Sequence, residues 1–303
     1  MACRFEVTLA ASGAHLLDAA RAALDEASRI ETALTVFCAS SELSYVNRHA
    51  GSGPVAVGAE LFSLLERCRG LHQETDGAFD ITTTPLSRCW GFLARAPHVP
   101  LADDIDAARR SVGMRHVRLD TAAHTVSFAR PDVELNLGSI GKGYALDAMS
   151  RAIRRPGVTH ALLSAGGSSL LVVGARRVWA VDVTSPQVMH PIARLELSSG
   201  ALGTSGQGEQ FTIADGRRYG HVIDPSTGRP TSGVLTASVV TGDAESADAL
   251  STAFPIGGPA LAERYCRDHP DTLAFVTPDE RPLRTLVFGR HRGARLEVRH
   301  AHA

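Results

Sequence analysis

The sequence predicts an α+β protein in which N-terminal helices pack on a mostly antiparallel β-sheet, and two observations support this fold class. Up to about residue 153, apolar residues recur mostly at three- and four-residue spacing, which is typical of amphipathic helices. From residue 161 onward, the pattern changes to short apolar or alternating runs separated by clusters of glycine, serine and proline. Helices followed by strands favour α+β over a doubly wound parallel sheet, in which strands and helices alternate.

The first half of the chain is expected to hold a strand, four helices and a hairpin. Loose alternation of apolar and polar residues predicts the strand at 4–9. Apolar faces at helical spacing predict helices at 15–36, 60–75, 101–112 and 144–153. Two short apolar runs, at 117–119 and 125–128, flank a turn and predict the hairpin.

The second half of the chain is expected to complete the sheet. Strands are predicted at 161–163, 169–173, 178–183, 194–197, 234–240, 273–276 and 283–288. A helix is expected from Asp248 to Phe254, continued beyond the intervening prolines from Leu261 to Cys266. We expect 1–290 to form a single domain, or two intertwined subdomains. The histidines of 291–303 match no metal-ligand spacing, so this segment is expected to be a solvated tail.

Composition and charge exclude several classes of protein. Of 303 residues, 44% are hydrophobic and 21% are charged, which are values of a globular chain that buries a core. Lys plus Arg is 31 and Asp plus Glu is 32, so the net charge of −1 predicts no nucleic-acid binding. The uncharged run 159–175 is broken by His160 and three glycines, so no transmembrane segment is expected. The five cysteines form no CxxC pair, and Arg4 and Glu6 interrupt any N-terminal apolar run; both features predict a reduced, cytoplasmic protein.

Two segments in the first half contain more glycine, threonine and aspartate than a core needs. GAFDITTTPL at 77–86, followed by Trp90-Gly-Phe, is compatible with a plain turn or with hydroxyls and rings that frame a planar ligand. LGSIGKGY at 137–144 is a Gly-rich loop before a helix, where backbone N–H groups and Lys142 favour a phosphate. Its spacing matches neither a Walker A loop nor a GxGxxG fingerprint, so a structural loop remains the alternative.

Two segments in the second half carry a histidine and a paired carboxylate and hydroxyl. His221 precedes a tight turn at 224–228, where a rigid loop would fix an imidazole for catalysis or binding; a structural histidine is the alternative. Asp248 and Thr252 are four residues apart on the predicted helix, so their side chains share a face. Such hard oxygen ligands suit Mg²⁺, although Asp248 could instead cap its own helix.

Taken in order, these segments resemble the family of FAD:protein FMN transferases, the ApbE family. The resemblance covers roughly residues 1–290. Its motifs, in the family's order, are FCASSELSYVN, FDITTTPL with WGF, NLGSIGKGYALD, LLSAGGSSLLVVG, GTSGQGEQF, HVIDPSTGRP and ADALSTA. Each motif alone is loose, but their shared order argues against chance agreement.

The resemblance implies an ApbE-like fold with FAD as substrate and Mg²⁺ as metal cofactor. In the implied reaction, a threonine hydroxyl of a target flavoprotein attacks the FMN phosphorus of FAD, and AMP leaves. The implied FAD contacts are Ala78, Phe79, Asp80, Asn136, Lys142 and Ile223. The implied metal ligands are Asp248, Thr252 and the backbone carbonyl of Ser139. His221 and Asp248 are the expected catalytic residues, with His221 as the acid–base group.

The chain departs from the family pattern at Asn136, where the family usually has aspartate. The amide keeps an acceptor but loses the charge and gains a donor. Many members of the family are exported or lipid-anchored, whereas no leader or lipobox is evident here, so we expect a cytoplasmic acceptor or the cytoplasmic face of a membrane complex. Two other functions stay open. One is a FAD pyrophosphatase with water as the nucleophile; the other is a noncatalytic FAD-binding protein, which Asn136 mildly favours.

Overall fold

The computed structural model divides into two compact units, each assembled from separate segments of the chain. It describes residues 3–9, 16–154, 158–174, 177–184, 191–206, 211–214 and 216–299. Unit 1 comprises Met1–Glu31, Ile140–Gly208 and Ser232–Ala303, and unit 2 comprises Thr32–Ser139 and Glu209–Thr231. All strand pairs among the described residues are antiparallel, which confirms the α+β fold class. None of the helices in this part of the chain has the length and apolar character that a membrane crossing requires.

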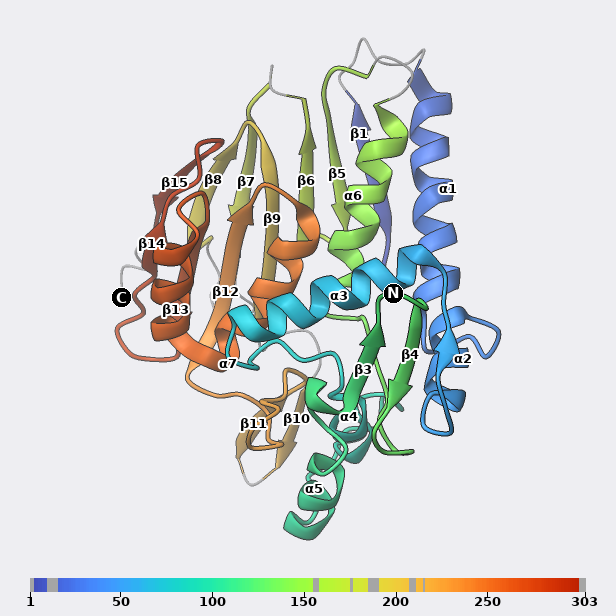
Figure 1. The fold of residues 1–303 in the computed structure, drawn as a ribbon. Coiled ribbons are helices and arrows are strands. Elements are labelled where there is room, and N and C mark those ends of the chain that lie inside the picture. The colour runs from blue at the N-terminus through green and yellow to red at the C-terminus, as the bar shows by residue number, and fades with distance from the viewer. Residues whose placement is uncertain are drawn as a thin grey trace. The chain divides into compact units, whose positions relative to one another are not determined.

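Unit 1 is built on a seven-stranded sheet with the order β1-β5-β6-β9-β12-β13-β14 (Figure 1). Its strands are β1 (Phe5–Leu9), β5 (Ala161–Ala165), β6 (Ser169–Val173), β9 (Gly200–Gly206), β12 (Val234–Thr241), β13 (Leu273–Pro278) and β14 (Leu286–Gly289). A second sheet has the order β15-β8-β7 and consists of β15 (Ala294–Val298), β8 (Ala193–Leu197) and β7 (Trp179–Val183). The two sheets share one apolar cluster, so they pack face to face.

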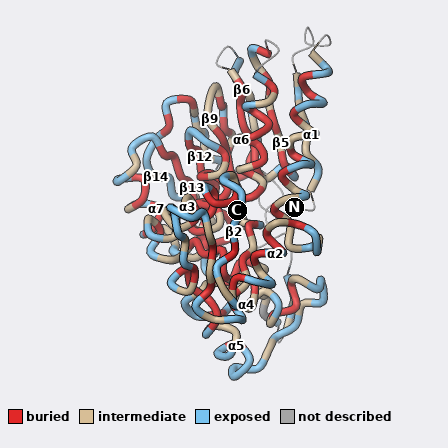
Figure 2. The backbone as a smooth tube through the Cα atoms, turned by 45° about the vertical axis from the view of Figure 1, so that its right-hand side comes forward, coloured by how far each residue is buried: buried red, intermediate tan, exposed pale blue. Residues whose placement is uncertain are grey.

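Strand β6 shows why the sequence of the sheet is so apolar. All five of its residues are buried, and in Figure 2 both β6 and β12 are coloured as buried along their length. Because side chains alternate along a strand, Leu171 and Val173 enter the cluster on the helical face. Leu170 and Val172 enter the cluster shared with the second sheet. A strand covered on both faces therefore reads as a continuous apolar run.

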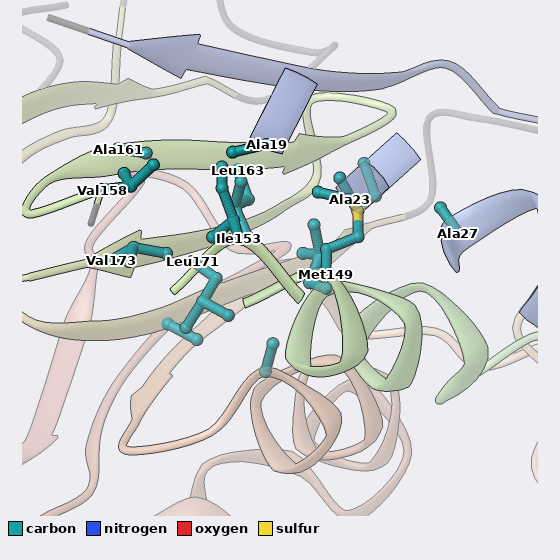
Figure 3. Packing of buried hydrophobic residues seen from close by; sticks show 14 of the residues in the cluster. Ala19, Ala23, Ala27, Met149, Ile153, Val158, Ala161, Leu163, Leu171 and Val173 are labelled. Carbon is teal, nitrogen blue, oxygen red and sulfur yellow. The ribbon is translucent and has the colours of Figure 1, made fainter. Parts of the chain in front are cut away.

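Helices α1 (Leu17–Leu34), α6 (Gly141–Ile153) and α7 (Ala244–Asp268) contribute to the cluster on the other face of the seven-stranded sheet. Ala19, Ala23 and Ala27 recur every four residues on α1, and such small side chains allow a helix to lie close to its neighbours. Figure 3 shows them in one cluster with Met149 and Ile153 of α6 and with residues of β5 and β6. The two predicted pieces of the last helix form one element with a break at Gly258, which has a φ of 67°.

Unit 2 consists of short helices, a three-stranded sheet and a hairpin. Its helices are α2 (Glu42–His49), α3 (Ala59–Glu74), α4 (Thr84–Cys89), α5 (Ala102–Arg109) and the 3-10 turn η2 (Met114–His116). The sheet has the order β2-β4-β3, with β2 (Val55–Ala56), β4 (Thr125–Phe128) and β3 (Val117–Asp120), and β10 (Phe211–Ala214) pairs with β11 (Arg217–Gly220). An apolar cluster around Trp90 joins α4, α5 and the turn that follows β11.

Three polar segments outside the predicted helices and strands form regular structure. The stretch 40–47 contains most of α2, which Ser41 caps by accepting the Ser44 N–H (3.0 Å), and which buries Leu43 and Val46. The threonine run before Pro85 leads into α4, with the proline in its first turn, where the missing N–H is not needed. The segment 203–206 belongs to β9. The start of the first predicted helix at residue 15 lies outside the described residues.

The expectation of a solvated tail is wrong for Ala294–Val298. These residues form β15, in which Leu296 lies opposite Leu195 of β8 and packs against the apolar cluster between the sheets. Arg295 and Glu297 point outward, so the strand has the period-two pattern of a half-buried edge strand. The charged and histidine-rich composition around it obscured that pattern. Residues 300–303 lie outside the described residues.

Candidate functional site

The predicted phosphate loop leads directly into α6, whose N-terminus is capped by another helix. The residue before the helix, Ile140, provides no side-chain hydrogen bond. The first N–H groups of a helix have no intrahelical partner and carry partial positive charge. The Gly143 N–H donates to Oδ2 of Asp248 on α7 (3.1 Å), so a carboxylate from α7 caps α6. Asp248 does not cap its own helix, because that position is held by Asp243, which accepts from the Ser246 N–H.

Asp248 is held by three donors in the interior of unit 1. Besides Gly143, its Oδ1 receives the Ser169 hydroxyl (3.0 Å) and lies 3.0 Å from Nζ of Lys142. Only 1% of the residue is exposed. An ionised carboxylate at that depth is costly unless it is paired and hydrogen-bonded, and here both conditions are met. The structure thus brings together two predicted site residues, Lys142 and Asp248.

Thr252 lies one turn further along α7 and is half-buried. Its hydroxyl is 3.4 Å from the backbone oxygen of Asp248 and 3.4 Å from Oγ of Ser205 on β9. The Ser205 hydroxyl is in turn 2.9 Å from that of Ser251. Carboxylate and hydroxyl oxygens therefore gather along this turn of α7.

This donor set fits a hard divalent cation. The described residues contain no cluster of three or more His, Cys, Asp or Glu side chains that could hold a metal, so Asp248 and Thr252 would need water or main-chain oxygens to complete a coordination shell. Mg²⁺ accepts that arrangement, because it usually binds through one or two carboxylates and keeps several waters. The ammonium of Lys142 already places a positive charge against the Asp248 carboxylate.

Two glycines allow the backbone of α7 to approach its neighbours closely enough to form this site. A Cβ at Gly143 would lie 2.0 Å from the Ala244 carbonyl oxygen, and one at Gly203 of β9 would lie 2.2 Å from the Ala247 carbonyl oxygen. Both contacts involve backbone atoms, which cannot rotate away as a side chain can. The position of Asp248 is therefore fixed by backbone contact on two sides.

We expect Gly143→Ala to separate α6 from α7 and to lower stability. The added methyl group would overlap the Ala244 carbonyl, and overpacking of this kind costs roughly 1–3 kcal/mol. Thermal denaturation measures the loss. Gly242→Ala is the control, since a Cβ there has nothing within 4 Å. Equal melting temperatures for the two variants would show that the helices do not depend on the glycine contact.

In unit 2, the predicted FAD-contacting segment is a tight loop after α3. The Phe79 N–H donates to the Thr75 hydroxyl (3.0 Å), and the Phe79 carbonyl is 3.0 Å from Nδ1 of His72. Asp80 is 7% exposed, and its carboxylate accepts the N–H and hydroxyl of Thr82. The side chains of Phe79 and Asp80 thus face the interior, and of the three predicted FAD contacts in this loop only Ala78 is half-buried.

Asn136 and Ser139 lie on an irregular segment directly before α6, where the segment Thr32–Ser139 of unit 2 ends. The Asn136 side-chain oxygen accepts the Gly138 N–H (2.8 Å), and the backbone N–H of Asn136 donates to the Ile81 carbonyl (2.8 Å). The amide at this position therefore uses the acceptor that a carboxylate would also offer. Ser139 is half-buried and directly precedes Ile140; its role as a carbonyl ligand stays a prediction.

His221 is half-buried and lies between β11 and a turn that is closed by its own hydrogen bonds. The Asp224 carboxylate accepts from Ser226 (2.8 and 2.7 Å) and Thr227 (3.0 Å), and the Gly228 N–H donates to the Asp224 carbonyl. Trp90 Nε1 donates to the Gly228 carbonyl (2.9 Å), which anchors the turn to α4. The turn that follows His221 is thus closed by several hydrogen bonds, and the catalytic role of His221 stays a prediction.

Ile223, predicted as part of a flavin wall, is 5% exposed and packs in the cluster with Trp90. In the structure this side chain is part of the apolar core of unit 2, so contact with a flavin stays a prediction.

Sequence reasoning missed Ser169, the hydroxyl that binds Asp248. It heads the otherwise apolar strand β6, on the face that turns toward the helices. The sequence does show one hydroxyl at the start of an otherwise apolar strand. Because a buried polar group needs a hydrogen-bond partner, that hydroxyl could have been identified as a candidate site residue.

Comparisons with known proteins agree with this geometry. The model of the ApbE family matches residues 1–277, so the chain belongs to the ApbE family. A FAD:protein FMN transferase of Vibrio cholerae is 30% identical over 233 residues, which cover 74% of this chain and 69% of that protein. One from Rhodobacter capsulatus is 32% identical over 265 residues, covering 83% of this chain and 50% of that protein.

Solved structures show the same fold. The structure of the ApbE protein from Thermotoga maritima has a TM-score of 0.84 at 28% identity and covers 96% of this chain and 93% of that chain. The flavin transferase ApbE from Vibrio cholerae has a TM-score of 0.80 at 25% identity, with 95% and 94% covered. The ApbE-like fold expected from the motifs is therefore confirmed.

Proposed function

We propose that this protein is a Mg²⁺-dependent transferase that moves FMN from FAD to a threonine hydroxyl of an acceptor flavoprotein and releases AMP. Membership of the ApbE family and the FAD:protein FMN transferases among its relatives support the reaction class. The observation that carries the proposal is the Asp248 carboxylate, buried at the N-terminus of α6 and paired with Lys142. A carboxylate, a lysine and a helix N-terminus together suit a metal-bound pyrophosphate.

The residues of unit 1 would act on the phosphates of FAD. Mg²⁺ bound to Asp248 and Thr252 would supply positive charge that stabilises the oxygens of the transferring phosphoryl group. Lys142 neutralises Asp248 in the structure. Once a cation shares that carboxylate, the ammonium would turn to a phosphate oxygen, to which a lysine binds as a point charge.

The residues of unit 2 would bind the flavin and handle the proton. In the proposed transfer, a bond forms between the threonine Oγ and the FMN phosphorus, and the bond from that phosphorus to the bridging oxygen breaks. AMP leaves with that oxygen. The proton of the threonine hydroxyl would pass to His221, whose rigid segment favours a fixed imidazole. Ala78 and the adjoining main chain would contact FAD.

We expect Lys142→Met to weaken FAD binding about tenfold or more, because hydrogen bonds to charged groups contribute roughly 1.5–3 kcal/mol. Isothermal titration calorimetry with FAD in the presence of Mg²⁺ measures the affinity. The control is Arg21→Met, which removes an exposed cation from the surface pair with Asp18. Unchanged FAD affinity in Lys142→Met would make the Gly-rich loop structural.

One assay separates the proposed transfer from the two other functions. The protein is incubated with FAD and Mg²⁺, with and without candidate acceptor proteins, and AMP is quantified. Release of AMP only with an acceptor supports transfer, and release without one indicates a FAD pyrophosphatase. The acceptors tested should include proteins that other family members modify. If the protein binds FAD but releases no AMP with any of them, it is a noncatalytic FAD-binding protein.

A further inference from the structure

Asp147 of α6 is a half-buried carboxylate for which the proposed reaction has no use. Its two oxygens each lie 3.0 Å from the backbone nitrogen of Ala244, and Oδ2 also accepts the Glu245 N–H (2.9 Å). Ala244 and Glu245 are the first two residues of α7, so their N–H groups have no partner within that helix. Asp147 therefore caps α7 from α6.

This cap is the counterpart of the one that Asp248 provides. Gly143 and Asp147 are four residues apart on α6, and Ala244 and Asp248 are four residues apart on α7, so each pair lies on one face of its helix. Asp248 binds the N–H of Gly143, Asp147 binds the N–H of Ala244, and the backbones touch between these two bonds. Each helix thus holds the N-terminus of the other, and the two caps together fix the register of α7 along α6.

The charge of Asp147 is costly in the folded protein. Burial, and to a smaller extent the nearby Asp243, raise the pKa of its carboxyl from 3.8 to about 6. The N–H groups of Ala244 and Glu245 and the charge of Arg151 lower the pKa but do not offset burial. Because this pKa is higher in the folded protein than in the unfolded chain, the folded protein holds the proton more tightly. The free energy of unfolding therefore falls as pH rises from about 4 to about 6. At neutral pH the ionised form of Asp147 is therefore less favourable in the folded protein than in the unfolded chain.

We propose that Asp147 is a positioning residue, which holds the start of α7 so that Asp248 stays in register with Lys142 and Gly143 when a divalent cation binds. A cation that draws on the Asp248 carboxylate weakens its bond to Gly143. The cap by Asp147 is then the bond that keeps the two helices in place. This inference rests on the metal site of the proposed function.

The test compares Asp147→Asn with Asp243→Ala. Asparagine has the shape of aspartate but lacks its charge, and it leaves one acceptor oxygen for the N–H groups of Ala244 and Glu245. Asp243 is exposed and caps the same end of α7 from within its own chain segment, by accepting the Ser246 N–H; its charge acts on Asp147, but its side chain does not replace the bond from Asp147 to Ala244. For each variant, Mn²⁺ affinity is measured by calorimetry without FAD, together with the melting temperature.

Loss of a residue that orients a metal ligand typically lowers metal affinity 10- to 100-fold, so we expect Asp147→Asn to bind Mn²⁺ about tenfold more weakly. Asp243→Ala should keep wild-type affinity while melting at a lower temperature.

Wild-type Mn²⁺ affinity in folded Asp147→Asn would overturn the inference, as would an equal loss in Asp243→Ala. If Asp147→Asn does not fold, Asp147→Glu decides the matter, because a longer arm keeps the charge but shifts the start of α7. Reduced affinity in the glutamate variant supports positioning, and wild-type affinity contradicts it. Absence of Mn²⁺ binding in the wild-type protein would instead contradict the metal site of the proposed function, which keeps the two failures distinguishable.

Discussion

Replacing Asp248 by alanine is expected to abolish metal-dependent release of AMP from FAD. The carboxylate is the one charged ligand that the proposed site offers, and it also pairs with Lys142 and caps α6. Loss of one charge-stabilising group in such a transfer costs on the order of 10²-fold or more in rate. The rate is measured over a range of Mg²⁺ concentrations, because a weakened site could otherwise be masked by saturating metal.

Two further variants make this result interpretable. Asp248→Asn keeps the shape of the side chain and one acceptor oxygen, which can serve either Ser169 or Gly143, so it should disturb the fold less than Asp248→Ala and still lose turnover. Asp268→Ala removes an exposed carboxylate at the other end of α7 and should leave the rate unchanged. Wild-type release of AMP by Asp248→Ala at limiting Mg²⁺ would remove Asp248 from the metal site.

His221→Asn is expected to bind FAD and Mg²⁺ but to transfer FMN at least ~10²-fold more slowly, which is the usual scale for losing general acid–base help. A threonine hydroxyl is a poor nucleophile at neutral pH, so it needs a base within reach or a metal that lowers its pKa. Imidazole has an ordinary pKa near 6.5, which suits proton transfer at cellular pH. Single-turnover kinetics with saturating FAD and acceptor measure the chemical step.

The competing explanation is that His221 only supports the turn at Asp224. The turn closes through bonds of Asp224 to Ser226 and Thr227 and is anchored by Trp90, so we expect its stability to depend little on the imidazole. Melting temperature and single-turnover rate are therefore measured on the same preparation, with His98→Asn in unit 2 as the control. A near-wild-type rate per folded molecule would remove His221 from the catalytic residues.

Those parts of the fold that rest on hydrophobic periodicity were predictable from the sequence. The helix at 60–75 and the strand at 169–173 match α3 and β6 closely, because each buries a regular apolar pattern. Elements that depend on local capping or on edge pairing were missed. Helix α2 is fixed by the hydroxyl of Ser41, and β15 by pairing with the distant β8, and neither interaction leaves a strong periodic signal.

For the candidate site, the sequence indicated which residue types matter but not how they are held. The spacing of Asp248 and Thr252 placed carboxylate and hydroxyl on one helix face, and the structure confirms that placement. The hydrogen bonds of Asp248 with Gly143 and Ser169 span 105 and 79 residues along the chain, so no local pattern encodes them. The motifs also assign Phe79, Asp80 and Ile223 to FAD binding, but they do not reveal how far each side chain is buried. In the structure all three side chains are buried in unit 2.

The most direct test of the central claim is mass spectrometry of acceptor flavoproteins co-expressed with this protein. The account predicts an FMN-sized adduct on one threonine of an acceptor, present with the wild type, absent with Asp248→Ala and absent when that threonine is replaced by valine. The contradicting result is release of free FMN and AMP in equal amounts while every tested acceptor stays unmodified. Another family member must modify the same acceptors in parallel, which shows that they are competent.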